Sequence, residues 1–93
     1  MSRCVLRYRI YLTSQPQTVR AIPGVVIDVE AAKLGVGPAA TYVLDLWIDG
    51  EDRVVERTFQ VVGTGEPISE GARYCGSTAK VGGYKWHVYE VEG

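Results

Sequence analysis

Apolar and polar residues alternate along most of the chain, and this period of two predicts β-strands. The first segment is the clearest case, because Leu6, Tyr8 and Ile10 share one face while Arg7 and Arg9 stand on the other. Similar alternation or a dense apolar run recurs at short intervals. The predicted strands cover residues 4–12, 18–22, 25–29, 42–49, 53–62, 73–81 and 84–91.

Proline and glycine separate these strands. Pro23–Gly24 predicts a sharp turn after the second strand, and residues 63–71 predict a loop that interrupts all regular structure. Asp49–Gly50 is the dipeptide that a type I′ turn favours, so the strands on either side of it are expected to form a hairpin. Gly82–Gly83 predicts a second hairpin turn.

Residues 30–41 fit neither strand nor helix well. Glu30–Leu34 have helical propensity, but about five residues before the Gly35–Pro38 break are too few to hold a helix alone. The segment is therefore predicted to be an irregular loop with at most one helical turn. Loops of this kind are sites at which function is added to a scaffold.

The pattern predicts one all-β domain over residues 1–93, built as a small antiparallel roll, sandwich or partly open barrel of six to seven strands. A chain of 93 residues supports a real but thin core. The last strand carries apolar side chains on both faces. This favours a central position in a sheet, or an edge that a second subunit covers.

The charge balance narrows the range of partners. A net charge of −1 argues against general nucleic-acid binding. Apolar runs stay shorter than the 18 or so residues of a membrane-spanning helix, and arginines interrupt the apolar residues at the start of the sequence, unlike in a signal peptide. We therefore expect a cytoplasmic protein that does not contact a membrane.

Cysteine and histidine are scarce: Cys4, Cys75 and His87 are the complete set. In the cytoplasm both cysteines are expected to be reduced packing residues, with a disulfide between them as the alternative, because pairing depends on their separation in the fold. Two cysteines and one histidine are too few for a closed zinc site without carboxylates. We expect neither a metal nor a cofactor.

The first four charged residues of the chain are all arginines. Arg7 and Arg9 project beside Tyr11, and a stripe of arginine and aromatic side chains can hold phosphates or stack on bases. The alternative is a solvated strand face on which these arginines pair with acids of neighbouring strands. Possible acidic partners are Asp45, Asp49, Glu90 and Glu92.

A second candidate for anion binding is Gly63-Thr64-Gly65, because successive N–H groups of a glycine-rich turn can form an anion nest. The loop lacks the lysine of a P-loop, precedes no predicted helix and carries Glu66, so a tight strand connection is the favoured interpretation. The candidate ligand-binding residues are Arg7, Arg9, Tyr11, Gly63, Thr64 and Gly65.

Trp47 and His87 are candidates for an interface. Trp47 lies between Asp45 and Asp49 on a polar face, where it is either an interface anchor or part of a second core layer. His87 lies between aromatic residues, which is more typical of a core or interface position than of a catalytic base. A base would also need a nucleophile within reach. The candidate nucleophiles are Cys75, Ser77 and Thr78.

Several short motifs resemble an uncharacterised family of short proteins encoded by phages and prophages. The matching stretches are Arg57–Phe59–Val61, Gly63-Thr64-Gly65-Glu66-Pro67-Ile68, Tyr74-Cys75-Gly76-Ser77, Trp86-His87-Val88-Tyr89-Glu90 and Ile22-Pro23-Gly24-Val25-Val26. The loop at residues 31–41 is the main departure from the family pattern. This resemblance implies a phage context and supplies no catalytic residue.

The resemblance therefore favours a small accessory protein that acts by stoichiometric binding, without enzymatic activity, as an inhibitor of host defence. It would either sequester an anionic signalling molecule through Arg7, Arg9 and the loop at residues 63–65, or occlude a host protein, such as a CRISPR nuclease, through Trp47 and acidic strand faces. The alternative is a minor structural or assembly protein of the virion, in which exposed strand edges and homo-oligomerisation would matter.

Overall fold

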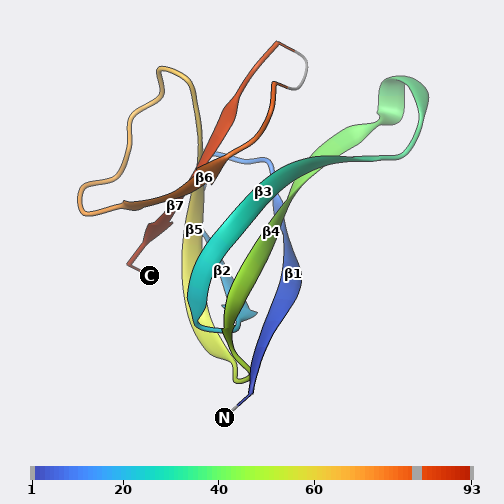
Figure 1. Ribbon diagram of the computed structural model, residues 1–93. Helices are drawn as coiled ribbons and strands as arrows, with labels where there is room; N and C mark the ends of the chain where they lie inside the picture. Colours follow the sequence, from blue (N-terminus) through green and yellow to red (C-terminus); the bar gives the residue numbers. More distant parts are fainter. Residues whose placement is uncertain (1, 81–82, 93) are drawn as a thin grey trace.

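The computed structural model describes residues 2–80 and 83–92 and shows an all-β fold (Figure 1). Its strands form two antiparallel sheets packed as a small open sandwich, which confirms the predicted class and excludes a closed barrel. The strands are β1 (Arg3–Tyr11), β2 (Gln17–Ala21), β3 (Gly24–Leu34), β4 (Thr41–Glu51), β5 (Val55–Gly63), β6 (Arg73–Ser77) and β7 (Trp86–Val91). A short 3-10 helix, η1 (Gly37–Ala39), lies between β3 and β4.

The strand order is β1-β4-β3 in the three-stranded sheet and β2-β5-β7-β6 in the four-stranded sheet. The last strand, β7, thus occupies a central position, as its two apolar faces predict. Its register with β5 places Val61 opposite Val88, and Gly63 opposite Trp86.

The hydrophobic core fills the space between the two sheets. Alternate residues of every central strand point inward, as a half-buried sheet requires. The largest fully buried apolar side chains are Phe59, Ile10, Ile22, Leu44, Leu46, Ile48 and Val88. Burial of each of these contributes about 1.5–3 kcal/mol. The free thiols of Cys4 and Cys75 lie partly buried against this core.

The hairpin predicted at Asp49–Gly50 is wrong. β4 continues through Gly50 to Glu51, and the chain then bends at Asp52 and crosses to the other sheet, so β4 and β5 do not pair. Gly50 serves a different purpose. A Cβ there would lie 1.6 Å from the carbonyl oxygen of Pro23, so glycine allows the Pro23–Gly24 corner to approach the backbone.

The irregular loop predicted from residue 30 is also wrong in its first half. Glu30–Leu34 continue β3, because this segment finds a complete ladder of partners on β4, ending with Leu34 opposite Thr41. Hydrogen bonding across the ladder outweighs a helical propensity of a few tenths of a kcal/mol per residue. The one short helical turn, η1, lies instead at Gly37–Ala39, within the Gly35–Pro38 stretch that was predicted to end any helix.

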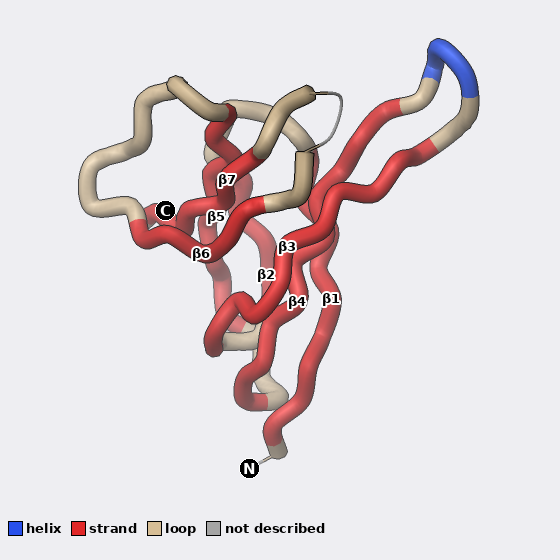
Figure 2. Tube along the Cα trace, turned by 45° about the horizontal axis from the view of Figure 1, so that its top comes forward, coloured by secondary structure: helices blue, strands red, loops and turns tan. Residues whose placement is uncertain are grey.

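Together, the ends of β3 and β4 form an arm, residues 31–42, that projects beyond the sandwich with η1 at its tip (Figure 2). Three large apolar side chains of this arm are exposed: Leu34, Val36 and Tyr42. Within the described residues, no helix is long and apolar enough to cross a bilayer.

The last two strands are shorter than predicted. β6 ends at Ser77 and β7 begins at Trp86, whereas the alternation predicted strands over residues 73–81 and 84–91. The predicted Gly82–Gly83 turn includes residue 82, which lies outside the described residues. The predicted loop after Gly63 is present and extends to Ala72.

Candidate functional site

The outer face is defined here as the side of the three-stranded sheet that turns away from the core. Arg9 and Asp45 lie directly opposite each other there, on β1 and β4. Their ion pair is bidentate, with Nε 2.8 Å from Oδ1 and one terminal nitrogen 3.1 Å from Oδ2. Arg3 pairs diagonally with Asp49 at 2.8 Å. These contacts match the alternative in which the arginines pair with acids on a neighbouring strand.

Trp47 lies at the centre of the outer face and is half-buried there. The guanidinium carbon of Arg7, its partner on β1, stands 5.7 Å from the ring centroid, within cation–π range. On the other side, the indole Nε1–H donates to the Glu30 carboxylate at 3.0 Å. The tryptophan is therefore held from β1 and β3 while it projects from β4.

The ion pair between Arg9 and Asp45 also shifts the pKa values of both side chains. The two hydrogen bonds from Arg9 hold the pKa of Asp45 below its ordinary value, against the opposing effect of burial. The same contact raises the pKa of Arg9. The Asp45 carboxylate, which is almost fully covered, therefore remains charged because the guanidinium lies over it.

The residues of the predicted ligand site do not gather in one place. Arg7, Arg9 and Tyr11 lie on β1, whereas Gly63 ends β5 in the other sheet, and Thr64 and Gly65 lie in the turn after it. The N–H of Gly63 donates to the carboxylate of Glu66, and the N–H of Glu66 donates to the Gly63 carbonyl at 3.0 Å. The loop thus uses the Gly63 N–H internally, as expected for a tight strand connection.

His87 belongs to a chain of hydrogen bonds that joins β5, β6 and β7. Its Nδ1 lies 2.7 Å from Ser77 Oγ, and its Nε2 lies 3.2 Å from Thr64 Oγ1. Ser77 Oγ also contacts the Tyr74 hydroxyl, and Thr64 Oγ1 lies 3.4 Å from the carbonyl of Lys85. A carbonyl only accepts, so Thr64 donates to it. With a neutral imidazole, Nε2–H then donates to Thr64, Nδ1 accepts from Ser77, and Tyr74 donates to Ser77.

Ser77 and His87 thus adopt the contact of a nucleophile and its base, because the β6–β7 register places them opposite each other. The far nitrogen of His87 meets a hydroxyl, however, and not the carboxylate that would stabilise an imidazolium. The other candidate nucleophiles point elsewhere. Thr78 Oγ1 accepts from the N–H of Trp86, and burial raises the pKa of the Cys75 thiol.

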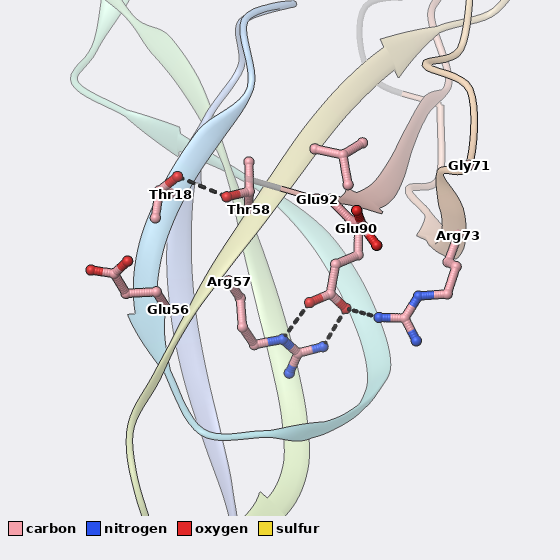
Figure 3. A pocket seen from close by; sticks show the side chains of 9 residues that line it. Thr18, Glu56, Arg57, Thr58, Gly71, Arg73, Glu90 and Glu92 are labelled. Carbon is pink, nitrogen blue, oxygen red and sulfur yellow. Dashed lines mark hydrogen bonds and ion pairs between the residues drawn. The ribbon is translucent and has the colours of Figure 1, made fainter.

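A buried ion pair between Arg57 and Glu90 was not singled out from the sequence as a site. Arg57 binds Glu90 through Nε at 2.8 Å and through a terminal nitrogen at 2.7 Å (Figure 3). Its other terminal nitrogen donates to the Ile22 carbonyl at 2.9 Å. The guanidinium also stands 5.2 Å from the Phe59 ring centroid. The available signal was an arginine on the apolar face of a strand, which requires a buried partner.

Arg73, on β6, completes this cluster. Its guanidinium lies 3.2 Å from Glu90 Oε1, the oxygen that also accepts from a terminal nitrogen of Arg57. Hydrogen bonds from Arg57 lower the pKa of Glu90, and burial opposes them. The cluster borders a polar pocket of about 510 Å³ whose wall includes the Thr18–Thr58 hydroxyl contact of 2.7 Å. Figure 3 shows both guanidinium groups directed at Glu90, so the pocket's cations are already engaged.

No group of three or more His, Cys, Asp or Glu side chains in residues 2–80 and 83–92 is arranged to hold a metal ion. Within the same ranges, every buried side-chain nitrogen and oxygen has a hydrogen-bond partner. On the outer face, Arg3 and Arg9 are paired with acids of β4, and Trp47 is held by Arg7 and Glu30.

The fold and this geometry define a small open β-sandwich with a charged, tryptophan-centred sheet face. The family model described as "Domain of unknown function (DUF7352)" matches residues 1–93, and the chain belongs to that family. The expectation of an uncharacterised family is thereby confirmed. No curated protein and no solved structure matches the chain.

Proposed function

We propose that this chain is a phage-type accessory protein that acts by stoichiometric binding in the host cytoplasm, as an inhibitor of host defence that occludes a host protein. The phage context rests on the motif resemblance. Occlusion rests on one observation, the position of Trp47 on the outer face between Arg7 and Glu30.

A fixed tryptophan beside arginine is well suited to protein recognition. Tryptophan and arginine are enriched among the residues that carry most binding energy in interfaces. Trp47 is already oriented by its cation–π contact and its hydrogen bond, so docking would cost little additional side-chain entropy. Arg3–Asp49 and Arg9–Asp45 would surround it with a polar rim of paired charges.

Occlusion of a protein is better supported than sequestration of an anion. An anionic ligand on β1 would have to displace Asp45 from Arg9, or Trp47 from Arg7. Both exchanges would leave a carboxylate or a ring without its cation. A protein partner can instead lie over a sheet face that carries both signs of charge, since such faces provide specificity through complementary pairs.

The test is infection of a host that carries an active defence system, with and without expression of the chain. Wild-type protein is expected to restore plaque formation by a defence-sensitive phage, and Trp47→Ala is expected to abolish the effect with an unchanged melting temperature. Ile68→Ala, which trims an exposed apolar side chain in a distant loop, is the matched control and should behave as wild type. Equal activity of Trp47→Ala and wild type would contradict the outer face as the docking surface.

A role as a minor structural or assembly protein of the virion is the second candidate, and the arm favours it. Val36 at its end is 86% exposed, and an apolar side chain on a projecting hairpin suits insertion into a neighbouring subunit. Mass spectrometry of purified particles tests this candidate. Stoichiometric presence in wild-type particles, lost with Val36→Asp, would support assembly over inhibition.

A further inference from the structure

A pocket of about 380 Å³ opens between the turn after β1, the end of β5 and the start of β7. It lies at the end of the four-stranded sheet and shares no residue with the outer face. Buried Val61 and Gly63 contribute to its lining, and Thr64, Glu66, Tyr84 and Trp86 line it further out. Its volume falls within the usual range for small-molecule sites.

Two aromatic rings form one wall of the pocket. The centroids of Tyr84 and Trp86 are 6.0 Å apart, with the planes tilted by 33°. Gly63 allows Trp86 to settle close to the backbone, because a Cβ at that position would lie 3.1 Å from Trp86 Cζ3. Tyr84 is 64% exposed, so the aromatic pair remains open toward the solvent.

Glu66 is the one charged residue among those described in the pocket lining. The N–H of Gly63 donates to its Oε1 and fixes the carboxylate at the rim. Elsewhere, Asp45 and Glu90 are each covered by an arginine, but no ion pair to Glu66 forms within the described part of the chain. The pocket thus combines π-faces with a carboxylate that has no cation of its own.

We propose that this pocket binds an organic cation, namely an alkylguanidinium or alkylammonium group. Ring faces attract cations through their quadrupole, and the carboxylate adds a charge-assisted hydrogen bond to an N–H donor. The alkyl part of the ligand would contact Val61 and the rings. The cation would come from a free small molecule or from an arginine or lysine side chain of a polypeptide, since both present the same chemistry.

The test is an NMR titration of the intact chain, following the indole N–H signal of Trp86. Butylguanidinium is expected to shift this signal saturably at millimolar concentrations, whereas butylurea, its neutral counterpart, leaves it in place. Glu66→Gln should weaken binding by about fivefold, the scale of one exposed ion pair. Glu70→Gln is the matched control, because Glu70 is exposed in the same loop but does not line the pocket.

A blocked Gly-Arg-Gly peptide distinguishes the two sources of the cation. Binding about tenfold tighter than that of butylguanidinium would indicate a polypeptide side chain, and equal affinity would indicate a free cation. Equal shifts with butylurea, the absence of a saturable shift, or equal affinities of Glu66→Gln and Glu70→Gln would overturn the proposal. Trp47→Ala should retain the cation site, so this result is independent of the occlusion test.

Discussion

Two bidentate ion pairs, Arg9–Asp45 and Arg57–Glu90, have the same chemistry in different surroundings. Each guanidinium donates two hydrogen bonds to a carboxylate on the adjacent antiparallel strand. The Arg9 side chain remains 43% exposed, whereas that of Arg57 is 8% exposed. Removal of Arg9 would open Asp45 to water. Removal of Arg57 would leave Glu90 with the exposed Arg73 alone and would leave the Ile22 carbonyl without its donor.

The comparison teaches that a pair's surroundings, more than its geometry, set its value to the fold. The Arg9 pair contributes less because water solvates its guanidinium and would reach Asp45 once that guanidinium is removed. A buried pair is costly to break because the remaining charge is left without solvation. The Arg57 pair therefore stabilises the corner that joins the sheets, and the Arg9 pair remains available to shape a surface.

Arg57→Ala is expected to produce the largest effect. Loss of its hydrogen bonds to Glu90 and Ile22 should lower the free energy of unfolding by about 3–5 kcal/mol, measured by urea denaturation. Arg57→Lys keeps the charge but cannot form the bidentate contact with Glu90, so it should recover only part of the lost free energy of unfolding. Arg73→Ala is the control because this exposed arginine approaches the same Glu90 oxygen. Equal losses of unfolding free energy in Arg57→Ala and Arg73→Ala would show that a buried arginine and an exposed arginine at Glu90 contribute alike.

The pH dependence of stability sharpens the comparison further. The folded-state pKa of Glu90 lies below its ordinary value, about 4.3 in an unfolded chain. Below that pH the unfolded chain binds more protons than the folded one, so the pair's contribution is complete above about pH 5 and is lost as the pH falls toward the folded pKa. Urea unfolding from pH 7 down to 3 should show this decline.

Glu90→Gln should flatten the decline while lowering stability at neutral pH. Glu92→Gln, which alters an exposed glutamate just after β7, should keep the wild-type profile. A remaining decline in Glu90→Gln is expected from Asp45, whose pKa is also lowered. A wild-type profile in Glu90→Gln would show that the acid sensitivity arises elsewhere.

Arg9→Ala is expected to have the smallest effect. Water replaces the guanidinium on Asp45, so the shift in the urea midpoint should be about a fifth or less of that from Arg57→Ala. The measurement is the same denaturation series, with Arg3→Ala as a second exposed pair on the same face. A loss as large as that from Arg57→Ala would mean that the outer face is part of the stabilising framework.

Alternation along the chain was enough to predict most strands, because the side-chain period is a local property. The partner of each strand was not local. The sequence of Asp49–Gly50 predicts a turn, and only the close approach of the Pro23 backbone explains why glycine is needed there. Residues 30–34 predict a loop, and only their hydrogen-bonded partners on β4 make them a strand.

The site was predictable to a similar extent. The alternation identified Arg7, Arg9 and Trp47 as residues of polar strand faces. Periodicity could not show that β1 pairs with β4 and that Arg7 lies opposite Trp47. The sequence signal for Arg57 was its position on an apolar strand face, and it identified no partner. Its partner Glu90 is 33 residues away and becomes adjacent only when β7 enters the sheet beside β5.

The close backbone contact at Gly50 restricts which residues can replace this glycine during evolution. No space exists there for even a methyl group, whereas a Cβ at Gly37 would meet nothing within 4 Å. Drift at position 37 is limited mainly by its left-handed backbone, which asparagine also tolerates. At position 50 any drift must move the corner between the sheets. In a saturation library selected for folding, we expect glycine alone to survive at position 50 and several residues at position 37.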